Sequence, residues 1–339
     1  MGTIRRAVLI AVLLPGLAGP LAAAESQGSR ILLHTLWTQR ELAGSAADHA
    51  VSRPSAVPVD LSPPAVTVPR LKHPPLCPAQ TGVIRRVAPD DGVKVAALTF
   101  DLCERASNRT GYRTEIVNFL RRGGIPATFF ACGKWLRSHP EKALQLMADP
   151  LFELGNHSWN HANLALTDGI ETRDQVLWTQ AQYEILRDRL RQRAAAAGLE
   201  AEMAGVPEAL RLFRLPYGRN SAATLESLSR LGLPVIQWDV LGEFDGGAWP
   251  PEKIAARAAA RVRPGSIILM HANAVPPKTH QVLPLLVKLL EQRGWRFVTV
   301  GRLLEMGEPE TVPEGFFEKP GDNAVYDRAH PDQGLLHKK

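Results

Sequence analysis

Short apolar runs alternate with longer amphipathic stretches between about Val93 and Met306. The runs, which have the length and composition of strands, are Val95–Phe100, Ala127–Ala131, Phe152–Gly155, Leu212–Arg214, Pro234–Asp239, Ser266–Met270 and Phe297–Val300. The stretches with apolar residues at helical spacing are Thr114–Arg122, Asp174–Ala197, Thr224–Leu231, Ile254–Val262 and Leu283–Gln292. Strands that alternate with helices predict an α/β fold with a parallel sheet or barrel. Six or seven such units in roughly 210 residues favour an irregular (β/α) barrel, and periodicity leaves a doubly wound open sheet as the alternative.

A signal peptide is predicted at residues 1–24. Arg5 and Arg6 precede an apolar run from Ala7 to Leu14, and Ala22–Ala24 form a small-residue cleavage site. The run is shorter than the roughly 20 residues that a membrane-spanning helix needs. We therefore expect cleavage, a periplasmic or secreted protein, and no stable membrane anchor.

Proline and glycine are frequent in both flanks of the periodic region. Residues 25–92 are rich in Pro and Ala, and proline at this density denies the backbone the hydrogen bonds of helix and sheet. They are predicted to form an extended, poorly ordered linker, with a short helix at residues 30–42. Residues 307–339 are polar and are predicted to form a surface or disordered tail. The folded domain is therefore expected at residues 93–306.

Charge and cysteine content add two expectations. The formal net charge of +6 falls to about +4 when Arg5 and Arg6 leave with the signal peptide, and the basic residues are scattered. No nucleic-acid partner is therefore expected. Cys77, Cys103 and Cys132 allow one disulfide in an exported protein and leave at least one thiol unpaired within the chain.

Polar side chains stand at the ends of five predicted strands. They are Asp101, His157 with His161, Arg214, Trp238 with Asp239, and His271. Because (β/α) folds carry their chemistry at the carboxyl ends of the strands, we expect these side chains to line one mouth.

Each of these residues has a plain structural alternative when it is taken alone. Two histidines four residues apart are more often a surface pair than a metal site, and Asp101 can simply cap a turn. Taken together, the residues have what metal-assisted amide hydrolysis needs. Imidazoles that share one face of a helical turn hold a cation, a carboxylate accepts the proton of water, and an imidazolium protonates the departing amine.

Four motifs, in order, resemble the polysaccharide deacetylase family (the NodB-homology domain, carbohydrate esterase family 4). They are Thr99–Cys103, His157–His161, Arg214–Gly218 and Leu269–His271, and Ala127–Phe130 is also typical of the family. The resemblance covers about residues 93–305. It implies a distorted (β/α) barrel with fewer than eight units.

The resemblance also implies a role for each residue. Asp101 would be the general base, Arg214 its orienting partner, and His271 the general acid. His157 and His161 would bind a divalent metal ion.

The substrate side of the resemblance is less complete. Tyr217 would offer a backbone N–H to the oxyanion. Trp238 and Asp239 are the nearest matches to a substrate-side Trp and an acid-tuning Asp, with Glu243 and Asp245 behind them.

Leu102 departs from the family, in which an Asp at this position binds the metal. A third protein ligand would have to come from Glu104, from Asp101 or from Cys103 as thiolate, and otherwise the ion would bind loosely. Two histidine nitrogens favour Zn²⁺, with Co²⁺ or Ni²⁺ as alternatives.

The expected activity is removal of N-acetyl groups from an amino-sugar polymer, such as peptidoglycan, a chitin-like chain or an exopolysaccharide. Two alternatives stay open from the residues. One is a metal-independent hydrolase of another amide bond, and the other is a non-catalytic carbohydrate-binding protein on the same fold.

Overall fold

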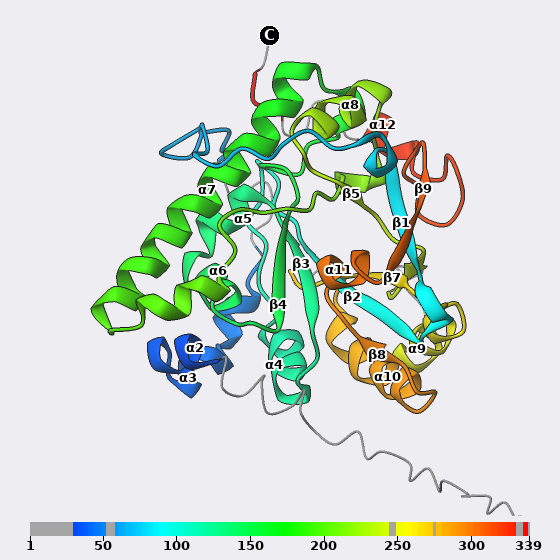
Figure 1. Cartoon of the computed structure of the whole chain (residues 1–339), viewed down its shortest axis with the longest axis horizontal. Helices are drawn as coiled ribbons and strands as arrows, with labels where there is room; N and C mark the ends of the chain where they lie inside the picture. Colours follow the sequence, from blue (N-terminus) through cyan, green and yellow to red (C-terminus); the bar gives the residue numbers. More distant parts are fainter. Residues whose placement is uncertain (1–29, 52–57, 244–248, 274–275, 330–334, 338–339) are drawn as a thin grey trace, which may run out of the picture.

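A curled, nine-stranded sheet organises residues 30–51, 58–243, 249–273, 276–329 and 335–337, which this computed structural model describes (Figure 1). Its strands are β1 (Val83–Pro89), β2 (Val95–Leu102), β3 (Ala127–Ala131), β4 (Phe152–Asn156), β5 (Val235–Ile236), β6 (Val240–Leu241), β7 (Ser266–His271), β8 (Arg296–Phe297) and β9 (Gly307–Val312). The order across the sheet is β4-β3-β2-β7-β1-β5, with β6 on β7, β8 on β2 and β9 on β1. Every residue of β2 is buried, as expected for a strand covered on both faces.

One residue joins the two ends of this strand order. Phe213 makes parallel bridges to Asn156 in β4 and to Val235 in β5. The central pairs β2–β3, β3–β4 and β2–β7 are also parallel. The sheet therefore curls into the predicted irregular (β/α) barrel rather than an open doubly wound sheet.

Helices pack around the sheet, and in Figure 1 α5–α7 lie on the opposite side of it from α9 and α10. The helices of the described residues are α2 (Ile31–Leu36), α3 (Gln39–Ala43), α4 (Thr114–Gly123), α5 (Gly133–Ser138), α6 (Pro140–Met147), α7 (Gly169–Ala196), α8 (Ala222–Arg230), α9 (Pro251–Ala259), α10 (Thr279–Glu291), α11 (Val300–Leu304) and α12 (Val325–Ala329). The longest, α7, begins at Asp168, whose side chain accepts from the N–H groups of Ile170 and Glu171.

The predicted elements agree with most of the barrel. β3 has the predicted bounds, and β2, β4 and β7 extend theirs by one or two residues. Three predicted strands are shorter. Leu212–Arg214 makes only the bridges at Phe213, Pro234–Asp239 is reduced to β5, and Phe297–Val300 is reduced because Val300 already belongs to α11. The predicted helix at residues 30–42 is divided into α2 and α3 by a capping box at Thr38.

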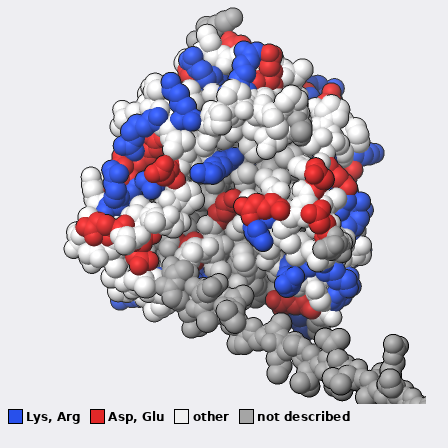
Figure 2. Space-filling view, viewed as in Figure 1, with Lys and Arg blue, Asp and Glu red and all other residues white. Residues whose placement is uncertain are grey.

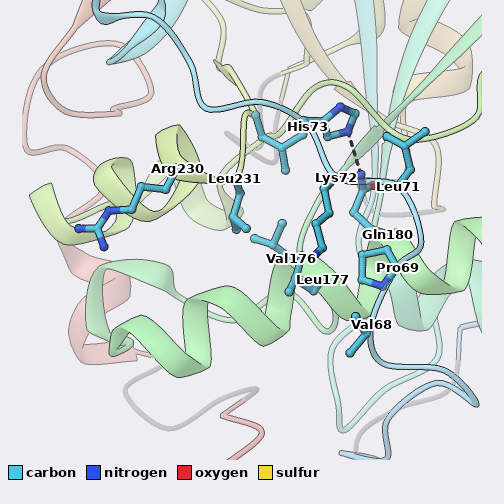
Figure 3. A pocket seen from close by; sticks show the side chains of 11 residues that line it. Val68, Pro69, Leu71, Lys72, His73, Val176, Leu177, Gln180, Arg230 and Leu231 are labelled. Carbon is cyan, nitrogen blue, oxygen red and sulfur yellow. Dashed lines mark hydrogen bonds between the residues drawn. The ribbon is translucent and has the colours of Figure 1, made fainter.

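The proline-rich segment is extended from residue 58 to 77 and lies against α7 and α8. The prediction of a poorly ordered linker over residues 25–92 is therefore wrong, because this segment is hydrogen-bonded to the helices and residues 83–89 form β1 of the sheet. The backbone N–H groups of Arg70 and Leu71 donate to Glu184 in α7 at 2.8 and 3.0 Å, and that of Leu76 donates to the Ser229 carbonyl in α8 at 2.9 Å. A cavity of about 170 Å³ lies beneath it, lined by Val68, Val176, Leu231 and neighbouring side chains (Figure 3). This cavity contains none of the residues predicted to carry the chemistry.

The C-terminal segment contributes a strand and a buried anchor. β9 pairs with β1 along its whole length, from Gly307 to Val312. Asn323 is fully buried and donates to the carbonyls of Tyr217 and Gly218 at 3.1 and 2.9 Å. The prediction that the domain ends at residue 306 is therefore wrong, because residues 307–329 pack on it.

Charges of both signs are interspersed on the face shown in Figure 2. No helix in the described part of the chain has the length and apolar character needed to cross a membrane. The predicted signal peptide lies outside the described residues.

Candidate active site

Asp101 and His271 lie at neighbouring strand ends. They are register partners in the parallel pair β2–β7, which brings both side chains to the carboxyl edge of the sheet. Asp101 is 4% exposed, whereas the side chain of His271 is 26% exposed. The two residues predicted as base and acid therefore meet at one edge, and His271 is the more open to solvent.

A buried ion pair fixes Asp101. Arg214, which is fully buried, donates from Nη1 to Asp101 Oδ1 at 2.9 Å and to Thr99 Oγ1 at 2.8 Å. Its Nε and Nη2 donate to the carbonyls of Ile236 and Gln237, both at 3.2 Å. Burial lowers the pKa of Arg214, and the Asp101 carboxylate opposes this shift. The guanidinium thus holds one oxygen of Asp101 and leaves Oδ2 to face the histidines.

A backbone carbonyl sets the tautomer of His157. Nδ1 lies 2.9 Å from the Arg214 carbonyl, which can only accept, so Nδ1 carries the proton. The lone pair of Nε2 therefore faces Asp101 Oδ2 and Cys103 Sγ, each at 3.5 Å. Burial lowers the pKa of His157, although Asp101 opposes the shift, and a neutral ring results. A neutral imidazole held in this way is the form that binds metal.

His161 reaches His157 through a tight loop. Ser158 and His161 have φ of +66° and +62°, and the His161 N–H donates to Ser158 Oγ at 3.0 Å. The two imidazole centroids are 4.9 Å apart. The predicted meeting of the histidines is confirmed, but the predicted helical turn is wrong, because residues 157–163 are not helical.

Glu243 orients His271. Its Oε1 accepts from His271 Nδ1, and its Oε2 accepts from the His271 backbone N–H at 3.1 Å and from Thr279 Oγ1. Burial lowers the pKa of His271, but the Glu243 carboxylate outweighs it, so the pKa lies above its ordinary value. Glu243 was a secondary candidate in the sequence, and in the structure it is the partner of His271.

Asp239 lies at the other end of β7. Its carboxylate accepts from Ser266 Oγ at 2.9 Å and from the Ile267 N–H at 3.0 Å, at the start of the strand that His271 ends. The predicted place of Asp239 beside the acid histidine is therefore wrong. The other secondary candidate, Asp245, lies outside the described residues.

The Pro216–Gly218 turn holds Tyr217 in the left-handed region, with φ of +57°. Its ring packs edge-on against His161, with the centroids 4.5 Å apart. A non-glycine residue persists in this conformation only where its surroundings fix it. Trp238, by contrast, is 2% exposed, and Phe317 packs on it at 5.5 Å. The predicted contact of Trp238 with substrate is therefore contradicted.

Two groups of candidate metal ligands in the described part of the chain share Cys103. The ligand atoms of Cys103, His157 and His161 lie within 4.8 Å of one another, and so do those of Asp101, Cys103 and His271. All three cysteines of the chain are free thiols. Burial, with a smaller contribution from Asp101, raises the pKa of the Cys103 thiol well above its ordinary value.

Glu104 does not join either group. It is fully buried and accepts from Lys134 Nζ at 3.0 Å, Ser138 Oγ at 2.6 Å and the Thr110 N–H at 3.1 Å. These bonds tie the loop after β2 to α5. The prediction that Glu104 binds the metal is therefore contradicted.

Residues 88–236, from the end of β1 to β5, match the family model described as polysaccharide deacetylase. This match includes Asp101, both histidines and Arg214, whose geometry is described above. The predicted resemblance to the polysaccharide deacetylase family is therefore confirmed.

Curated relatives are about a quarter identical to this chain over the residues that align. The chitooligosaccharide deacetylase of Bradyrhizobium sp. is 26% identical over 53% of this chain and 79% of that protein. The peptidoglycan-N-acetylglucosamine deacetylase PgdA of Listeria monocytogenes is 26% identical over 68% of this chain. The match spans 43% of PgdA and only 31% of a bifunctional xylanase/deacetylase from Pseudobutyrivibrio xylanivorans.

Solved structures include a mutant, with restored enzymatic activity, of a CE4 family pseudoenzyme from Bacillus anthracis. It is 25% identical, with a TM-score of 0.53 over 68% of this chain and 72% of that one. The wild-type pseudoenzyme gives the same TM-score at 24% identity and supports the fold alone.

The side chain of Leu102 does not face the candidate site. Its side chain is fully buried in the main core with Phe100 and Phe129, so it cannot approach a metal beside His157. Alternation along β2 places Asp101 and Cys103 on the other side of the strand.

Proposed function

We propose that the protein is an exported deacetylase that removes N-acetyl groups from an amino-sugar polymer by metal-assisted hydrolysis. The observation that carries this proposal is that a candidate base and a candidate acid lie at adjacent strand ends, each paired with its own partner. Arg214 pairs with Asp101, and Glu243 pairs with His271. Amide hydrolysis needs such a base and acid on either side of one carbonyl.

Asp101 is the proposed base. Arg214 occupies Oδ1, which leaves Oδ2 to accept a proton from water as the water oxygen bonds to the acetyl carbon. Because the carboxylate is almost fully buried, few waters compete for that oxygen.

His271 is the proposed acid. Glu243 raises the pKa of His271, which favours the protonated ring, and it occupies Nδ1, which directs Nε2 away from that carboxylate. The C–N bond breaks as Nε2 gives its proton to the sugar nitrogen. The products are acetate and a free amine.

His157 and His161 fit a divalent cation. The tautomer of His157 directs a lone pair toward the space that its ring shares with His161, and two imidazoles suit Zn²⁺ or Co²⁺ better than Mg²⁺. A cation held there lowers the pKa of water and polarises the amide carbonyl. The backbone N–H of Tyr217, in its fixed turn beside His161, is proposed to bind the oxyanion.

A panel of substrates tests this activity. Acetate release would be measured with the full chain and added Zn²⁺ on chitin oligomers, peptidoglycan and acetylated xylan, with Asp101→Asn as the inactive control. We expect release from one or both N-acetylated polymers and none from the control. Binding of these polymers without any release would favour the carbohydrate-binding alternative.

Export is a separate part of the proposal. It rests on the charged start, apolar run and Ala22–Ala24 site of residues 1–24. The intact mass of protein recovered from the periplasm or medium should correspond to a chain that begins near Glu25. A retained Met1 would contradict this.

A further inference from the structure

We propose that Cys103 supplies a third protein ligand, as thiolate, to the cation held by His157 and His161. This inference rests on the metal site of the proposed function and names the residue that takes the place left by Leu102. The resulting set of one sulfur and two nitrogens leaves a fourth tetrahedral position for water or substrate.

The distance between the ligand atoms fits a shared cation. Bonds of about 2.3 Å to sulfur and 2.0 Å to nitrogen, at a tetrahedral angle, place these atoms about 3.5 Å apart. Cys103 Sγ and His157 Nε2 are 3.5 Å apart. Asp101 Oδ2 is also 3.5 Å from His157 Nε2, but the Asp101 carboxylate groups with Cys103 and His271 and not with both His157 and His161.

The backbone of Cys103 is fixed in this position. Its carbonyl accepts from Thr110 Oγ1 at 2.6 Å and from Asn273 Nδ2 at 2.9 Å, one residue beyond the end of β2. Thr110 in turn donates its N–H to Glu104, whose buried ion pair with Lys134 anchors the loop. Glu104 therefore supports the position of the thiol instead of binding the cation.

The two residues on either side of Cys103 do not reach the histidines. Leu102 is in the core, and Glu104 has three partners of its own. A thiolate also adds a soft donor, which strengthens the preference for Zn²⁺ or Co²⁺ over hard cations. Binding displaces the thiol proton to solvent.

Cobalt absorption distinguishes a sulfur ligand from nitrogen and oxygen ligands. The full chain would be stripped with a chelator and titrated with Co²⁺, and the near-ultraviolet charge-transfer band of a thiolate–Co²⁺ bond recorded. We expect this band in the wild type and its loss in Cys103→Ser. The matched control Cys77→Ser, which changes an exposed thiol, should keep the band.

Zn²⁺ affinity, measured by competition with a chromophoric chelator, provides a second readout. Cys103→Ser should weaken binding by at least about 10- to 100-fold, the loss seen when residues that only orient a metal ligand are removed. Cys103→Asp should recover much of this affinity without recovering the cobalt band. Circular dichroism would verify that both variants fold.

The role of Cys103 would be overturned if Co²⁺ binds through His157, so that His157→Ala abolishes binding, but the complex shows no sulfur band. It would also be overturned if Cys103→Ser keeps the band. Either result would leave the proposed deacetylase intact. Absence of Co²⁺ and Zn²⁺ binding in the wild type would remove the metal site itself. Loss of acetate release in Asp101→Asn is measured independently, so the two failures are distinguishable.

Discussion

Replacing Arg214 by methionine removes the cation from a fully buried ion pair. The side chain of Arg214 is 0% exposed and that of Asp101 is 5% exposed. Methionine fills much of the same volume but donates no hydrogen bond. Asp101 Oδ1, Thr99 Oγ1 and the carbonyls of Ile236 and Gln237 would each lose a donor.

The expected cost follows from this burial. Breaking a buried pair by removing one partner typically costs about 3–5 kcal/mol, because the other charge stays buried and unpaired. This is a large part of the roughly 5–15 kcal/mol that stabilises a folded protein. Arg214→Lys keeps the charge but loses the planar fork, so its cost should be smaller.

Urea unfolding followed by tryptophan fluorescence measures the change in the free energy of unfolding. The matched control is Arg230→Met, because Arg230 forms an i,i+4 pair with Glu226 whose side chains are 70% and 63% exposed. An exposed pair contributes about 0–1 kcal/mol. The double variant Arg214→Met with Asp101→Asn should lose less than the sum of the single losses, because the unpaired charge is gone.

A loss for Arg214→Met no larger than that of Arg230→Met would refute this reasoning. Additive losses in the double variant would show that the two side chains do not depend on each other.

Three further predictions concern the acid–base pair and the C-terminal segment. Asp101→Asn and His271→Ala, each verified to be folded by circular dichroism, should lower the turnover of acetate release by roughly 100-fold or more, and near-normal turnover of both would contradict the assigned roles. Glu243 raises the pKa of His271, and activity should fall as pH rises through that pKa. Glu243→Gln should therefore move the alkaline limb of the pH–rate profile to lower pH. An unmoved limb would show that Glu243 does not set the pKa behind it. Asn323→Ala removes buried donors from two carbonyls and should lower the free energy of unfolding by about 1–3 kcal/mol in urea titrations; an unchanged midpoint would mean that the C-terminal segment does not stabilise the domain.

The sequence predicted the barrel well where burial is strong. β2 and β3 are continuous apolar runs because both faces of each strand are covered, and such runs are visible without a structure. β9 was missed because its exposure alternates and its sequence contains Pro309 among charged residues. It lies at the edge of the sheet, where proline and charge are tolerated.

The part of the candidate site that lies at strand ends could be predicted from the sequence. Asp101 and His271 end neighbouring strands, so parallel register brings them together. His157 and His161 meet through a loop with positive φ, which the spacing of the two histidines does not reveal.

The partner of the acid histidine depends on a loop path. Asp239 is the last residue of a predicted strand, whereas Glu243 lies beyond β6, a strand of two residues that pairs with β7. That pairing brings Glu243 to the end of β7 and leaves Asp239 at its beginning. Sequence periodicity cannot give the register of so short a strand.

The central claim is that Asp101 and His271 hydrolyse an N-acetyl group. The most direct measurement is mass spectrometry of a chitin oligomer after incubation with the Zn²⁺-loaded full chain, with acetate quantified in the same reaction. We expect one free amine for each acetate released by the wild type, and neither product with Asp101→Asn. Equal product formation by the wild type and by Asp101→Asn would contradict the roles of Asp101 and His271. A folded, Zn²⁺-loaded wild type that forms neither product from any N-acetylated polymer would also contradict them.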